Sequence, residues 1–89
     1  MTPVAITYDS ESDALSIDFP GAGPGRSVRT EHLDEVRLVD YDAGGELISI
    51  ELLDVSRGVE IDGLPEPDVV RTALERVAAE QGWPSVVRG

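Results

Sequence analysis

The sequence predicts an α+β fold, in which an antiparallel β-meander of four to five strands is followed by one C-terminal helix packed on the sheet. Apolar residues recur at every second position through the first two thirds of the chain, which is the period of a half-buried strand. The period then changes to that of an amphipathic helix. A Gly/Pro-rich stretch, 63–67, separates the two patterns. We therefore divide one domain into a β-sheet region, 1–62, and a helix with its tail, 63–89.

The first two strands are indicated by alternation on either side of an acidic turn. Their large apolar residues are Val4, Ile6, Tyr8, Leu15, Ile17 and Phe19. Alternation places these side chains on one face of a sheet and the intervening residues on the other. Residues 9–13 consist of Asp, Ser and Glu, and Asp and Ser side chains bond their own backbone in turns.

Two further strands are joined by a tight turn. In the first of them, Val36 and Leu38 alternate with Arg37 and are assigned to the buried face. In the second, the apolar residues are Ile48, Ile50 and Leu52. The connection, 42–45, contains two adjacent glycines, which can adopt the positive φ of a tight hairpin.

A weaker pattern lies between these two pairs of strands. Residues 26–32 predict an edge strand, and the Gly/Pro-rich residues 20–25 before it predict a surface loop. The sequence does not fix the order of the strands in the sheet.

The helix is predicted over 67–81. Its apolar stripe consists of Val69, Val70, Ala73, Leu74, Val77 and Ala78. Pro67 suits the first turn, where the acidic residues on either side of it face the positive end of the helix dipole. Gly82 is a natural C-cap, with Pro84 just beyond it. The apolar stripe must be buried, and the sheet is the surface that can cover it.

The charge of the chain excludes several classes of partner. Eighteen acidic residues stand against seven basic ones, all of them Arg, so the formal net charge is −11. Such a surface repels phosphate backbones and anionic lipids, which argues against nucleic-acid and membrane partners, and it attracts a basic protein. No stretch approaches the ~20 apolar residues of a membrane span, and no signal peptide is indicated. With no cysteine, we expect a cytoplasmic protein without disulfides.

Two motifs resemble those of the DUF2283 family of small proteins of unknown function. Residues 8–17 resemble its opening, Y-D-x-E-x-D-A-L-x-I. Residues 40–56 resemble its second block, D-Y-D-x-x-G-x-(I/V)-x-x-I-E-(I/L)-L-x-(A/V)-S. The resemblance covers about 4–57. It implies no catalytic role for the acids in these motifs, and it implies an antitoxin-like function as the partner of a small toxin.

Asp40, Asp42 and Glu51 are candidate metal ligands. Counted from Asp40, they occupy positions 1, 3 and 12, and Gly45 occupies position 6, which is the spacing of an EF-hand Ca²⁺ loop. However, position 5 is Gly44, which offers no side-chain ligand, and the flanks are predicted strands rather than helices. A plain hairpin turn is the alternative.

A second acidic group lies in the first turn. Asp9, Glu11 and Asp13 would hold Mg²⁺ or Mn²⁺ if the fold brought them to Asp40 or Asp42, and paired carboxylates would also suit general acid–base chemistry. Solvated turns are the alternative. The sequence contains neither a phosphate-binding Gly-rich motif nor a Gly-x-Ser-x-Gly motif. We therefore expect no cofactor and no enzymatic activity.

The tail contains the candidate partner-binding residues Trp83, Val86 and Val87. Trp is prominent in interface hot spots, and the tail could pair as an extra strand on the edge of a neighbour. The alternative is that Trp83 packs on its own domain.

A homodimer is predicted from the residues at the end of the fourth strong strand pattern. Leu47, Leu53 and Val55 fall on the parity opposite to that of the predicted core residues, so a second apolar face or a bare edge would need cover. The predicted function is a non-enzymatic protein-interaction module that binds a basic protein, such as a toxin nuclease. The alternative is a metal-binding protein or a metal-dependent enzyme that uses the acidic turns.

Overall fold

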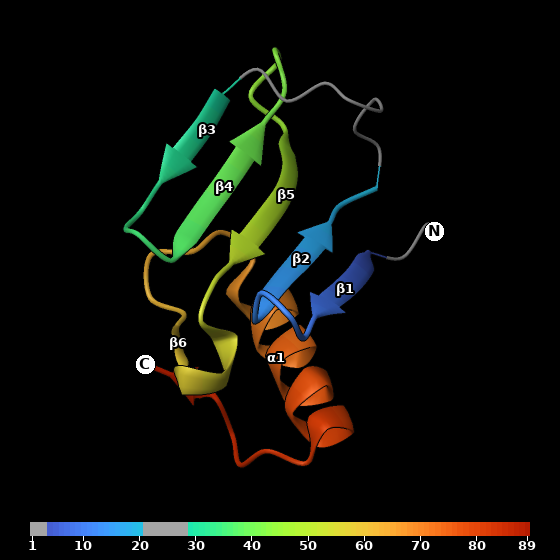
Figure 1. The fold of residues 1–89 in the computed structure, drawn as a ribbon. Coiled ribbons are helices and arrows are strands. Elements are labelled where there is room, and N and C mark those ends of the chain that lie inside the picture. Colours follow the sequence, from blue (N-terminus) through green and yellow to red (C-terminus); the bar gives the residue numbers. More distant parts are fainter. Residues whose placement is uncertain (1–3, 21–28) are drawn as a thin grey trace.

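The computed structural model describes residues 4–20 and 29–89. One antiparallel sheet and one helix form the fold, and the helix covers one face of the sheet (Figure 1). The strands of this sheet are β1 (Ala5–Asp9), β2 (Ala14–Asp18), β3 (Arg29–His32), β4 (Arg37–Tyr41) and β5 (Leu47–Leu52). The remaining elements are a 3₁₀ turn, η1 (Val55–Arg57), the short strands β6 (Val59–Glu60) and β7 (Val87–Arg88), and the helix α1 (Pro67–Gln81). The predicted α+β class, an antiparallel meander followed by one helix, is confirmed.

The strand order, which the sequence left open, is β1-β2-β5-β4-β3. The β1–β2 hairpin and the consecutive strands β3, β4 and β5 meet where β2 pairs with β5, and Ile17 lies opposite Ile50 in this pair. All of these pairings are antiparallel. β3 lies at an edge, as predicted. The predicted strand residues 26–28 and loop residues 21–25 lie outside the part of the chain that the structure describes.

The core lies between the sheet and α1. Its fully enclosed side chains (less than 2 % exposed) are Leu15, Ile17, Val39, Ile50, Leu52, Val55, Val70, Ala73, Leu74 and Val77. The sheet region and the helix contribute to the same buried cluster. Apart from Val69, which is half-buried, the predicted helix stripe is buried.

The structure corrects the predicted inward face of β4. Val39 is fully buried, whereas Leu38 is half-buried. The cause is the register with β5, because Val39 lies opposite the buried Ile50 and Leu38 lies opposite the exposed Glu51. The predicted alternation was therefore right in its period and wrong in its parity.

The helix has the bounds and the C-cap that were predicted. Pro67 is its first residue, and Gly82 follows its last. Gly82 has φ 76°, and its N–H donates to the carbonyls of Ala78 and Ala79. This left-handed conformation is the reason that glycine suits the position.

The tail beyond the helix returns to its own chain. β7 pairs with β6 in parallel, and Val87 lies opposite Val59. The Val59 N–H donates to the carbonyl of Val86 at 2.7 Å, and the Ile61 N–H donates to that of Arg88 at 3.0 Å. The tail is thus an extra strand, added to a neighbouring segment of the same chain.

Candidate functional site

The face of the sheet that points away from α1 is polar, and we call it the open face. Cross-strand register defines two rows on it, because alternate residues of each strand share a face. The first row is Asp18, Ser49, Asp40 and Thr30. The second row is Ser16, Glu51, Leu38 and His32. Three carboxylates and three hydroxyls therefore lie on adjacent strands of one flat surface.

No arginine lies on the open face among the residues that the structure describes. Asp18 and Glu51 are exposed on it. Arg29 is on the other side of the sheet, where its guanidinium lies 4.5 Å from the centre of the Tyr41 ring. Arg37 shares the inward parity of Val39. The carboxylates on the open face are consequently not neutralised by neighbouring arginines of the described sheet.

Two hydroxyl groups hold the Asp40 side chain in place on the open face. Thr30 Oγ1 donates to Asp40 Oδ1 at 2.5 Å, and Ser49 Oγ donates to Asp40 Oδ2 at 3.0 Å. Both donors lie directly opposite Asp40 in the neighbouring strands. The carboxylate is therefore fixed in position by cross-strand pairs, which are the ordinary unit of sheet stabilisation.

The structure does not bring the three candidate metal ligands together. Asp40 and Glu51 lie in different rows of the open face, and Asp42 lies in the β4–β5 turn. There, Asp42 Oδ1 accepts the N–H groups of Gly44 and Glu46, both at 2.9 Å. Within residues 4–20 and 29–89, no group of three or more His, Asp or Glu side chains is arranged to hold a metal ion.

Acidic side chains in two other turns accept hydrogen bonds from the backbone of the same turn. Asp9 Oδ1 accepts the Glu11 N–H at 3.0 Å. Asp34 Oδ1 accepts the Val36 N–H at 3.0 Å in the β3–β4 turn. Each bond joins residues two positions apart, as in the Asp42 turn, which is the usual role of Asp in tight turns. Asp13, by contrast, is bonded to residues outside the turn.

Asp13 joins Tyr8 and Ser56 in a cluster that we call the Tyr8–Asp13–Ser56 clamp. Tyr8 Oη donates to Asp13 Oδ1 at 2.7 Å, and Ser56 Oγ donates to Asp13 Oδ2 at 2.7 Å. The Ser56 N–H donates to the same carboxylate at 3.1 Å. The backbone of Asp13 has φ 54°. Three motif residues thus meet at the point where the β1–β2 turn contacts η1.

The clamp changes the pKa values of two of its members. Burial raises the pKa of Asp13, but the hydrogen bonds from Ser56 and Tyr8 outweigh it, so the pKa lies below its ordinary value. Burial, the hydrogen bond to Asp13 and the nearby negative charges together raise the pKa of Tyr8 to about 12. At neutral pH, an ionised carboxylate therefore accepts from a neutral phenol and a neutral hydroxyl. The three side chains thus tie the β1–β2 turn to η1.

The three candidate partner-binding residues of the tail contact their own chain. The Trp83 ring packs edge-on against Tyr8, with the ring centres 5.4 Å apart and the planes at 88°. Val86 is buried in the core, and Val87 is half-buried where it pairs with Val59. Their role in partner binding stays a prediction.

The structure corrects one part of the basis of the predicted homodimer, and the homodimer itself stays a prediction. Val55, which was assigned to a second apolar face, is fully buried in the core. The positions of β5 that share the open face include Ser49 and Glu51, which are polar. The open face is therefore mainly polar, with Leu38 as its apolar member in the two rows, and Leu47 and Leu53 are half-buried. Two edges of the sheet, β1 and β3, remain.

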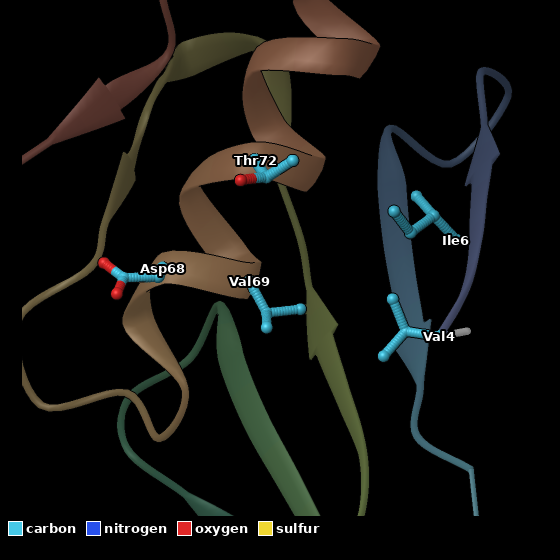
Figure 2. A pocket seen from close by; sticks show the side chains of 5 residues that line it. All are labelled: Val4, Ile6, Asp68, Val69 and Thr72. Carbon is cyan, nitrogen blue, oxygen red and sulfur yellow. The ribbon is translucent and has the colours of Figure 1, made fainter. Parts of the chain in front are cut away.

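An apolar groove of about 290 Å³ lies between β1 and the first turns of α1 (Figure 2). It is lined by Val4, Ile6, Asp68, Val69 and Thr72. Figure 2 shows Val4 and Ile6 pointing toward the helix and Val69 pointing back toward them, whereas the carboxylate of Asp68 points away. The groove is thus apolar where β1 and α1 face each other. The sequence did not indicate this groove. The apolar pattern of α1 does not show that Val69 lies at the margin of the buried stripe, where it remains half-buried.

Comparison with known proteins identifies a relative and a family. An uncharacterised protein of Methanocaldococcus jannaschii is 37% identical over 59 residues, which are 66% of this chain and 47% of that protein. The chain thus spans about half the length of this relative. No solved structure matches the chain. In the part of the chain that the structure describes, no helix is long and apolar enough to cross a membrane. The family described as "Protein of unknown function (DUF2283)" matches residues 5–56, and the chain belongs to this family.

Proposed function

We propose that the protein is a non-enzymatic interaction module that binds a basic protein through the open face. The observation that carries the proposal is the pair of rows on this face, with Asp18, Asp40 and Glu51 on adjacent strands and no arginine among the described residues of the face. The opposite face is taken up by α1, so the open face is the broad surface of the sheet that is left for a partner (Figure 1).

The charge of the whole chain supports the same partner class. A net charge of −11 accelerates encounter with a basic protein, and the fixed carboxylate of Asp40 provides an acceptor that needs no reordering on binding. The alternative of a metal site in the turns receives less support, because the carboxylates of Asp9, Asp34 and Asp42 already accept backbone N–H groups. An antitoxin-like protein that masks a basic toxin is one specific form of this function.

The test compares two doubly neutralised variants with equal net charge. Asp18→Asn/Glu51→Gln removes two charges from the open face, and Glu75→Gln/Glu80→Gln removes two from exposed positions of α1. The binding partner is a small basic protein encoded beside the gene, or otherwise cytochrome c as a general cationic protein, in calorimetry at low salt. We expect the open-face variant to lose about threefold in affinity per charge, the size of a surface ion pair, and the helix variant to lose less.

Two results would contradict the proposal. Equal losses in both variants would mean that net charge alone governs binding, without a preferred face. An unchanged affinity in the open-face variant would place the contact elsewhere on the molecule. Circular dichroism spectra of the two variants should match that of the unaltered protein, because all four positions are exposed.

A further inference from the structure

β1 is an edge strand with two unlike sides. It pairs with β2 on its inner side, and within residues 4–20 and 29–89 no strand pairs with its outer side. On the helix side, Ile6 and the preceding Val4 line the groove that Val69 closes (Figure 2). A further strand laid along this edge would therefore have one set of alternate side chains above an apolar groove.

The other side of β1 continues the acidic open face. Ala5 and Thr7 are small and exposed there, and Asp9 ends the strand. Ala5 lies opposite Asp18 in the register of β1 and β2, so a long side chain placed beside Ala5 would extend over it toward the Asp18 carboxylate. The second set of alternate side chains would thus face negative charge.

We propose that an extended segment of the basic partner pairs with the outer edge of β1, with apolar residues in the groove alternating with basic residues toward Asp9 and Asp18. This inference rests on the proposed function and names the segment that the partner offers. Backbone hydrogen bonds along the edge supply affinity in such β-augmentation, and the alternate side chains supply specificity.

The charge of the chain favours this occupant over a second copy of the chain. Two copies would each carry a net charge of −11, which opposes self-association, whereas a cationic strand is attracted. The groove, at about 290 Å³, is at the lower limit of small-molecule pockets and suits a few aliphatic side chains. The other edge is protected, because β3 exposes the charged residues Arg29 and Glu31, a usual device against strand pairing.

The experiment titrates ¹⁵N-labelled protein with a blocked seven-residue peptide of alternating valine and arginine, at millimolar concentration and low salt. A peptide of the same composition with its valines and arginines in separate blocks is the control. We expect the alternating peptide to shift the amide signals of 5–9, Val69 and Thr72 and to slow hydrogen exchange in β1. The block peptide should bind at least about threefold more weakly.

Two variants test the two sides of the added strand separately. Val69→Asn makes the groove polar, and Asp18→Lys reverses the charge near Ala5, with Glu46→Lys in the β4–β5 turn as the control of equal charge change. We expect Val69→Asn and Asp18→Lys each to weaken the alternating peptide severalfold and Glu46→Lys to weaken it less. Asp18 is exposed, so this arm remains informative if Val69→Asn unfolds the helix end.

The outcomes separate this inference from the proposed function. Signal shifts confined to Ser16, Leu38 and Glu51 would leave a basic partner on the open face and overturn the strand pairing. An absence of shifts with either peptide would overturn the pairing, while the protein-binding test above would still decide the function. Shifts in β1 that depend on protein concentration without peptide would assign the edge to a second copy and also overturn the proposal.

Discussion

The Tyr8 hydroxyl donates a 2.7 Å hydrogen bond to Oδ1 of Asp13, a residue with left-handed backbone conformation at φ 54°. The same carboxylate accepts the Ser56 hydroxyl and N–H from 43 residues further along the chain. These three residues lie in the two motifs of the family. The first motif and the end of the second are therefore joined by one carboxylate, which gives these three polar residues a structural role.

Loss of the Asp13 carboxylate should destabilise the protein. Asp13→Ala leaves Ser56 and Tyr8 without their acceptor and places alanine at positive φ, so we expect a loss of about 2–3 kcal/mol in the free energy of unfolding. Asp13→Asn keeps an acceptor and tolerates the left-handed conformation, and should cost about half as much. Urea denaturation measures both, with the exposed Glu11→Gln as the control. Equal stability of Asp13→Ala and the unaltered protein would contradict the role of the clamp.

The clamp should also appear in the alkaline titration of tyrosine. Because the pKa of Tyr8 is raised to about 12, the folded protein should show a phenolate step near that pH in its absorbance at 295 nm. Neutral Tyr8 is favoured in the folded state, so its contribution to stability is present below pH 10 and is lost as the pH rises toward 12. Tyr8→Phe should abolish the step. A step that persists in this variant would belong to another group.

Acid should weaken the fold partly through Asp13. Hydrogen bonds from Ser56 and Tyr8 hold its pKa below 3.8 against the effect of burial. A depressed pKa contributes stability that is present above the unfolded value and is lost as the pH falls through the folded value. We therefore expect the stability difference between the unaltered protein and Asp13→Asn to shrink from pH 5.5 to pH 3, measured by urea denaturation. A difference that grows over this range would refute the assignment.

Arg37 joins β4 to the segment before the helix. Its guanidinium donates to the carbonyls of Glu60 at 2.9 Å and Asp62 at 2.7 Å, and it pairs with Asp34 at 2.8 Å. The Arg37 side chain is 14% exposed, so most of it is enclosed by its neighbours. Arg37→Lys loses the planar fork and should cost about 1–2 kcal/mol in thermal unfolding. The same substitution at the exposed Arg71 should be close to neutral, and a similar cost there would show that Arg37 is not special.

The C-cap of α1 offers a test of backbone strain alone. A Cβ added at Gly82 would meet no atom within 4 Å, but φ is 76°. Gly82→Ala should therefore cost about 1 kcal/mol through the left-handed conformation and nothing through crowding. The matched control is Gly44→Ala, where the nearest atom, Oδ1 of Asp42, is 3.5 Å away and no positive φ occurs. Chemical denaturation that finds equal costs at both positions would contradict this account of the cap.

The sequence predicts the helix well and the sheet less completely, for physical reasons. The bounds of α1 follow from local signals, Pro67 at its start and Gly82 at its end, so they could be predicted without tertiary information. The inward face of β4 could not, because an apolar pair at Leu38 and Val39 fits either parity and the register with Ile50 decides between them.

In the candidate site, too, features set by neighbouring residues could be predicted, whereas contacts between segments far apart in the sequence could not. The turn roles of Asp9 and Asp42 follow from local residue chemistry and agree with the predicted alternative of plain turns. The clamp and the open face need the β2–β5 pairing and the approach of η1, which join segments far apart in the sequence. Periodicity shows which residues share a face of one strand, but it does not show which strands are neighbours.

The pairing of β2 with β5 also determines how the chain must fold. Two hairpin-built units, β1–β2 and β3–β4–β5, can each assemble from neighbouring residues, whereas the Ile17–Ile50 contact requires them to dock. Closure of that long loop carries an entropic cost before contacts in the core offset it, so we expect docking to be the slow step of folding. Substitutions along the β2–β5 seam should therefore slow folding itself, whereas those in the outer strands should chiefly hasten unfolding.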